Sequence, residues 1–146
     1  MNRFETLQLP GERTVVAPDG CDVRVLLALA AGGMAHFELA AGRTARAITH
    51  RTVEEIWFVL SGRGEMWRKQ DEHEETVVLE PGACVSIPVG THFQFRATGA
   101  RALSAVAVTL PPWPGDGEAV EVIGPWQPTP VSRDPSRRQE RLGGPK

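Results

Sequence analysis

The chain has 146 residues, of which 41% are hydrophobic, and it carries a formal net charge of -2. A chain of this length has the usual size of one domain and can bury one modest core. The nearly balanced charge provides no long-range attraction for nucleic acid or for an anionic membrane, so neither is expected as a partner. The longest apolar run, near Val23–Met34, contains Arg24 and is far shorter than the roughly 20 residues of a membrane-spanning helix.

The N-terminus and the cysteines indicate a cytoplasmic protein with reduced thiols. The first residues, MNRFETLQLPGERT, lack the apolar core of a signal peptide. Cys21 and Cys84 are too few and too far apart to form a metal cluster or a disulfide framework. We therefore expect a cytoplasmic location.

The middle of the chain is typical of short strands separated by turns, with little that favours helix. Pairs of turn residues, among them Gly32-Gly33, Asp71-Glu72 and Pro81-Gly82, interrupt the apolar runs. Many short strands at even spacing predict an all-β sandwich or barrel with antiparallel pairing. The runs rich in β-branched, aromatic or leucine residues are CDVRVLLALA, MAHFELA, TARAITH, EEIWFVLSG, GEMWRKQ, ETVVLE, CVSIPVG, THFQFRAT and ALSAVAVTL.

The strand EEIWFVL is apolar on both of its faces. Side chains alternate along a strand, so Glu55, Trp57 and Val59 share one face, while Ile56 and Phe58 belong to the other. A strand with one solvent-exposed face would carry polar residues on that face. We therefore expect another part of the protein, or a second copy of it, to cover the outer face.

After Leu110 the composition changes to proline, glycine and charged residues, and the strand alternation is lost. Trp113 and Trp126 are apolar groups that gain by docking on a barrel, whereas the end of the chain has almost nothing to bury. The expected organisation is an N-terminal segment over 1–20, a barrel over 21–110, a docked extended segment over 111–127 and a disordered tail over 128–146.

A histidine and a carboxylate stand between two glycines in the stretch GRTARAITHRTVEEIWFVLSGRG. The order Gly42, His50, Glu55 and Gly62 resembles the first motif of the cupin superfamily. The position of the first histidine of that motif holds Ile48. One of the usual metal ligands of the family is therefore replaced by an apolar residue.

A second stretch, PGACVSIPVGTHFQFR, resembles the second cupin motif, with Gly82, Pro88 and Gly90 in register. Phe93 stands where that motif carries its metal-binding histidine, and His92 comes one residue earlier. The chain thus resembles a small single-domain cupin, of the type 2 cupin domain, over most of its expected barrel. The resemblance implies a cupin-type antiparallel β-barrel, also described as a double-stranded β-helix or jelly roll, and a homodimer.

The resemblance also implies a metal site, for which the sequence supplies an incomplete set of ligands. His50 and Glu55 are suitable donors for Fe, Mn, Ni or Zn, but two donors alone hold a metal poorly. Ile48 shares the strand face of His50 and forms an apolar wall there. His92 is a third metal ligand if the preceding turn is one residue tighter than the family pattern, which would bring it into the place of Phe93.

Polar strand faces elsewhere allow two interpretations. His92, Gln94 and Arg96 share one face of a strand whose other face carries phenylalanines, and His36 and Glu38 form a similar polar face. Either these faces meet solvent or a partner, or they point inward and form a substrate pocket. In a pocket, Arg96 would bind a carboxylate or phosphate, while His36, His92 or Gln94 would orient the substrate or move a proton.

Three functions for a small-molecule-binding protein of this kind stay open. The first is a divalent-metal-dependent enzyme of oxygenase or isomerase type, with His50, Glu55 and His92 as metal ligands. The second is a metal-free isomerase or cyclase in which Glu55 or His50 is the general base and Arg96 stabilises the developing anion. The third is a barrel that binds a metabolite without transforming it. In each case Trp57 either stacks on a planar ligand or belongs to the core.

Overall fold

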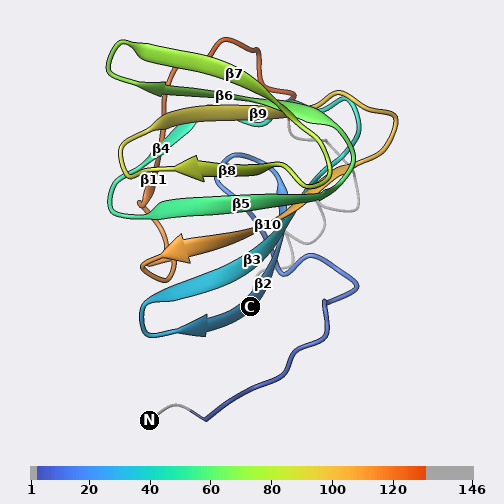
Figure 1. Ribbon diagram of the computed structural model, residues 1–146, viewed down its shortest axis with the longest axis vertical. Helices are drawn as coiled ribbons and strands as arrows, with labels where there is room; N and C mark the ends of the chain where they lie inside the picture. Colours follow the sequence, from blue (N-terminus) through green and yellow to red (C-terminus); the bar gives the residue numbers. More distant parts are fainter. Residues whose placement is uncertain (1–2, 131–146) are drawn as a thin grey trace, which may run out of the picture.

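The computed structural model describes residues 3–130, and in this part of the chain all regular structure is β-strand (Figure 1). No helix among these residues is long and apolar enough to cross a membrane. The predicted cytoplasmic location stays a prediction. The strands are β1 (Val15–Val16), β2 (Asp22–Leu29), β3 (Gly32–Leu39), β4 (Ile48–His50), β5 (Glu54–Ser61), β6 (Gly64–Gln70), β7 (His73–Leu79), β8 (Cys84–Ile87), β9 (His92–Ala97), β10 (Leu103–Leu110) and β11 (Ala119–Glu121).

The strands form two antiparallel sheets. One sheet has the order β1-β2-β3-β10-β5-β8, and the other has the order β11-β4-β9-β6-β7. Figure 1 shows them as two curved layers, with β6, β7 and β9 in one layer and β2, β3 and β10 in the other. Neighbours that are far apart in sequence, such as β3 and β10, give the crossed connections of a jelly roll. The all-β jelly roll predicted from the sequence is confirmed.

The interior is formed by alternate side chains of both sheets. In β5, Glu55, Trp57 and Val59 are buried, whereas the residues between them are exposed. Trp57 meets Phe93 and Phe95 of the opposite sheet edge-on, with ring centroids 6.5 and 5.0 Å apart. Because burial of a large apolar side chain contributes about 1.5–3 kcal/mol, these rings stabilise the pairing of the two sheets.

A motif glycine is required by the turn that follows β5. Gly62 has a φ of 81°, a conformation that side chains with a Cβ rarely adopt. A Cβ at this position would also collide with the carbonyl oxygen of Ala102. The second glycine of the first motif therefore allows β5 to end beside the start of β10.

The segment after β10 returns to the five-stranded sheet. Its strand β11 pairs with β4, and the buried amide of Gln94 anchors the following residues. Gln94 Nε2 donates to the carbonyl oxygens of Ala45 at 2.8 Å and Trp126 at 2.9 Å, and its Oε1 accepts from Trp126 N at 3.1 Å. Thr129 Oγ1 accepts from Thr44 N at 2.8 Å. The expected disordered tail lies outside the described residues from position 131 onward.

Candidate functional site

A cavity of about 720 Å³ is lined by residues of both sheets. Its volume lies in the range that holds a small organic ligand, roughly 300–1,000 Å³. Most of its wall is apolar, and no lysine or arginine among residues 3–130 lines it. The polar side chains on the wall are Asp19, His50, Glu55, Thr109 and Asp116.

His50, at the end of β4, is buried with only 4% of its surface exposed. The rings of Phe93 and Trp113 meet it edge-on at centroid distances of 5.3 and 5.0 Å. Burial lowers the pKa of the imidazole, and the charge of Glu118 opposes this shift without reversing it. His50 is therefore neutral at pH 7, and its buried Nδ1 has no hydrogen-bond partner among the described residues.

Glu55, near the start of β5, is as deeply buried as His50. Its Oε2 accepts a hydrogen bond of 2.6 Å from Trp57 Nε1. Burial raises the pKa of this carboxyl from 4.5 to about 7; the bond from Trp57 opposes the shift, and the charge of Asp19 adds to it. Near pH 7 the side chain is thus present in both its acid and its carboxylate form.

Asp19 is a second buried carboxyl on the cavity wall, and the sequence motifs did not identify it. It lies in the loop between β1 and β2, and its Oδ1 accepts from the backbone N–H of Cys21 at 3.1 Å. Burial raises the pKa of Asp19. Asp19 and Glu55 line the same cavity, and the charge of Asp19 helps to raise the pKa of Glu55.

The turn between His50 and Glu55 is held by Glu118, another residue that the motifs did not identify. Its carboxylate accepts from Thr52 N at 2.6 Å, Thr52 Oγ1 at 2.8 Å and Val53 N at 2.7 Å. These bonds connect the turn to the segment that precedes β11. Glu118 therefore positions the two polar side chains of the motif relative to one another.

The positions of the two missing motif histidines form an apolar wall. Ile48 of β4 and Phe93 of β9 are directly paired across the sheet, and both line the cavity. On the opposite sheet, Phe37 and Trp57 stack at a centroid distance of 5.0 Å with their planes 10° apart. Trp57, one of the predicted pocket residues, thus belongs both to the core and to the cavity wall.

The structure does not bring His92 into the site. His92 is paired with Thr49 and Lys69 in the sheet, and Phe93 keeps the inward position. The tighter turn that would exchange His92 for Phe93 does not occur. The expectation that His92 completes a metal site is therefore corrected by the alternation of side chains along β9.

Arg96 and Gln94 share the outward face of β9 with His92, and neither lines the cavity. Arg96 Nε and Nη2 donate to Glu65 Oε1 at 3.1 and 2.8 Å, and the guanidinium carbon lies 4.1 Å from the ring centroid of Trp126. The expected role of Arg96 in substrate binding or anion stabilisation is thus not supported, because its guanidinium pairs with Glu65 of β6 and packs on Trp126 of the C-terminal segment.

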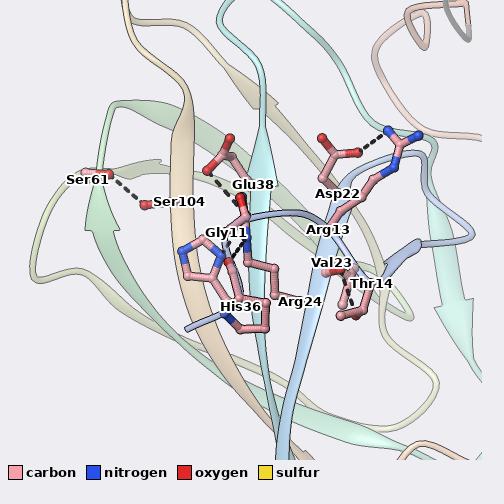
Figure 2. A network of polar contacts seen from close by, with 11 residues as sticks. Gly11, Arg13, Thr14, Asp22, Val23, Arg24, His36, Glu38, Ser61 and Ser104 are labelled. Carbon is pink, nitrogen blue, oxygen red and sulfur yellow. Dashed lines mark hydrogen bonds and ion pairs between the residues drawn. The ribbon is translucent and has the colours of Figure 1, made fainter. Parts of the chain in front are cut away.

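His36 also lies outside the cavity, on the outer face of β3. Figure 2 shows it beside Arg24 and Glu38, below the backbone of Gly11. Arg24 Nη1 lies 3.5 Å from His36 Nδ1 and 3.6 Å from Glu38 Oε2, and its other nitrogens donate to the carbonyl oxygens of Pro10 and Gly11 at 2.8 and 3.2 Å. His36 therefore belongs to the anchor of the N-terminal segment, and its predicted place in a substrate pocket is corrected.

The donors in the cavity do not fit the divalent metal that the motifs imply. Catalytic metal sites use about three protein ligands. Within residues 3–130 no group of three histidine, cysteine, aspartate or glutamate side chains is placed to hold an ion. Ile48 and Phe93 occupy the remaining motif positions, and Glu55 is partly protonated near pH 7.

Comparison with known proteins agrees with the jelly-roll architecture. The structure of BH2720 from Bacillus halodurans has 23% sequence identity and a TM-score of 0.58, with 68% of this chain and 76% of that chain covered. CapF from Staphylococcus aureus has 17% identity and a TM-score of 0.63, with 73% and 32% covered. Oxalate decarboxylase from Bacillus subtilis, a protein with Mn(II) centres, has 14% identity and a TM-score of 0.64, with 76% and 30% covered.

The chain corresponds to about a third of the length of CapF and of oxalate decarboxylase. No curated protein sequence matches it. The family model for the cupin domain matches residues 35–109, which include both sequence motifs and the strands from within β3 to within β10. Together with the two-sheet jelly roll, this match shows that the chain belongs to the cupin domain family.

Proposed function

We propose that this cupin domain binds a small, mainly apolar organic molecule in its cavity without a metal, and that His50 and Glu55 contact the ligand. One observation carries the proposal: a mainly apolar cavity of about 720 Å³ contains an imidazole and a carboxyl group that are both buried. Burying a polar group without a full set of partners costs free energy. A ligand that bonds to both groups offsets that cost.

The side chains at the motif positions favour a metal-free site over the metal enzyme that the motifs suggest. Ile48 and Phe93 supply apolar contacts where imidazoles would be needed, and His92 faces away. CapF has been solved with the inhibitor 3-isopropenyl-tropolone, and oxalate decarboxylase from Lactobacillus farciminis has been solved as a formate complex. At this level of identity they support the fold alone, so the ligand is inferred from the cavity.

The test combines metal analysis with ligand binding on protein purified without an affinity tag. Elemental analysis is expected to find far less than one Fe, Mn, Ni or Zn per chain. A fragment mixture followed by ligand-observed NMR is expected to give binders that weaken in His50→Ala and Glu55→Gln. Glu54→Gln is the matched control, because Glu54 is the exposed neighbour of Glu55 on the same strand. Stoichiometric metal that is lost in His50→Ala would refute the metal-free site, and absence of any binder would refute ligand binding.

Acid–base catalysis is a second candidate, and the pKa of Glu55 favours it. A group whose pKa is about 7 is suited both to accept and to return a proton at neutral pH. In an isomerisation, the Glu55 carboxylate would remove a proton from a carbon of the ligand, and the acid would return it at another carbon. Deuterium from D₂O entering a bound ligand, with loss in Glu55→Gln, would support catalysis. Binding without exchange would leave only the binding function.

We further propose that the protein is a homodimer formed through the outer face of the six-stranded sheet. Met34, Ile56, Phe58 and Leu60 are 43–48% exposed on this face. Val108 of β10 is paired with Met34 on one side and Ile56 on the other, so the patch is continuous across three strands. A second copy would cover the apolar face that the sequence of β5 predicts.

The N-terminal segment adds a second reason to expect a partner subunit. Residues 3–9 are all exposed, and no other part of the described chain covers the side chain of Phe4. Figure 1 shows this segment leaving the barrel. In a dimer, Phe4, Leu7 and Leu9 would gain apolar contacts with the second copy.

The oligomeric state is measured by light scattering after size exclusion. Phe58→Glu is expected to give a monomer, whereas Val78→Glu, a change at a position of similar exposure on the other sheet, is expected to leave a dimer. Cys84 is exposed and directly paired with Phe58, so its thiol should react with a labelling reagent faster in Phe58→Glu. A monomeric native protein with a freely reactive Cys84 would refute this interface.

A further inference from the structure

The charged side chains that line the cavity are all acidic among the described residues. Asp19 and Glu55 are buried on the wall, Asp116 lies on its exposed part, and no lysine or arginine of the described chain lines it. An anionic ligand would meet carboxyl groups and no fixed positive charge. The wall therefore disfavours carboxylate or phosphate ligands and favours a group that donates hydrogen bonds.

The two buried carboxyl groups have unused acceptor capacity. Neither forms an ion pair within residues 3–130. Asp19 accepts a hydrogen bond from Cys21 N, and the Cys21 side chain and the charge of Arg46 also favour its carboxylate form. Glu55 accepts one hydrogen bond, from Trp57 Nε1. A carboxylate has about four lone-pair sites, so most of the acceptor positions of this pair are open to a ligand.

Two further observations point to a ligand at the same place. His50 lines the cavity and is only 4% exposed, yet its Nδ1 has no hydrogen-bond partner among the described residues. The rings of Phe37, Trp57 and Trp113 also line the cavity. Aromatic rings attract cations through their negative faces, and aromatic-lined sites with carboxylates are suited to organic ammonium groups.

We propose that the ligand is an organic cation, an amine attached to an apolar ring-containing body, with its ammonium group bound by the carboxylates of Asp19 and Glu55 and its body against the aromatic wall. This inference rests on the proposed binding function and narrows it to one chemical class. The ammonium supplies a positive charge on the cavity side of the two carboxyl groups, where no lysine or arginine of the described chain lies. Its three N–H donors match the open acceptors of that pair.

Three indoles of similar size and different charge test the inference directly: tryptamine, tryptophol and indole-3-acetate. Binding is measured by ligand-observed NMR titration at about pH 8, above the pKa of Glu55 of about 7. Native protein is expected to bind tryptamine at least about tenfold more tightly than the neutral alcohol, and indole-3-acetate most weakly. Equal binding of tryptamine and tryptophol would overturn the amine assignment and leave the binding function intact.

Variants identify the groups that recognise the charge. Asp19→Asn keeps an acceptor for Cys21 N, and Glu55→Gln keeps an acceptor for Trp57 Nε1, while both remove a negative charge. Each is expected to reduce the preference for tryptamine by about tenfold, and Glu54→Gln is expected to preserve it. Thermal unfolding of each variant shows that it is folded before it is titrated.

The remaining outcomes are also decisive. A preference for tryptamine that survives both Asp19→Asn and Glu55→Gln would refute this carboxyl pair as the cation site. Binding of neutral fragments without binding of any amine would refute the amine assignment alone. Failure of fragments of every charge to bind would refute the proposed binding function itself.

Discussion

Replacing Glu55 with glutamine should change how the stability of the protein depends on pH. The pKa of Glu55 is raised from 4.5 to about 7, mainly by burial, so the folded state binds a proton that the unfolded state has lost between these values. The stability contributed by the protonated form is fully present below about pH 4.5 and is lost as the pH rises through about 7. At 1.36 kcal/mol per pKa unit, this group lowers the free energy of unfolding by about 3 kcal/mol across that range.

Glutamine cannot titrate and still accepts the hydrogen bond of Trp57 Nε1 through its amide oxygen. The free energy of unfolding of Glu55→Gln relative to the native protein should therefore rise by about 3 kcal/mol from about pH 4.5 to about pH 8. Asp19 is present in both proteins, and the burial that raises its pKa is common to both.

Urea denaturation followed by tryptophan fluorescence at several pH values measures this difference. Glu54→Gln, at the exposed neighbouring position, should run parallel to the native protein across the whole range. If Glu55→Gln also runs parallel, the carboxyl of Glu55 is not buried in the way described, and the argument for a half-protonated group in the cavity fails.

Three further changes test other parts of the structure. Gln94→Leu removes the hydrogen bonds that hold the segment around Trp126 and should lower the free energy of unfolding by about 1–3 kcal/mol, measured by urea denaturation. Glu118→Ala leaves the N–H groups of the turn before β5 without their acceptor, so the free energy of unfolding should fall by about 2–4 kcal/mol. Ligand binding measured by NMR should also weaken. An unchanged stability would contradict the positioning role of Glu118. Ile48→His combined with Phe93→His places the two motif imidazoles on the cavity wall and should create zinc or nickel binding that calorimetry detects. The native protein and the single variants are the controls. If the double variant gains no metal binding, the inward placement of these two positions is contradicted.

The strands and turns were predictable because their determinants are local. Runs rich in β-branched, aromatic or leucine residues identified β5, β9 and β10. The glycine at position 62 marked a turn whose φ only glycine adopts readily. The spacing of two motifs identified the cupin domain, which the family match and the jelly roll confirm.

The orientation of the polar faces was not decided by the same patterns. Alternation shows that His92, Gln94 and Arg96 share a face, but it does not show which face of β9 is inside. The phenylalanine face is the inner one, because the rings of Phe93 and Phe95 pack on Trp57 of the other sheet. The polar face consequently serves the C-terminal segment, and the predicted pocket residues on it lie outside the cavity.

The sequence by itself determined the strand alternation, the turns and the motif positions of His50 and Glu55, because each depends on neighbours within a few residues. Only the tertiary structure decided that Asp19 and Glu55 line the same cavity and that Glu118 holds the turn between the two motif residues. Asp19 and Glu55 are 36 residues apart, and the bonds of Glu118 join positions more than 60 residues apart, so no local pattern encodes either arrangement. The charge and the protonation of the cavity follow from such contacts, because burial and neighbouring groups in space set a pKa.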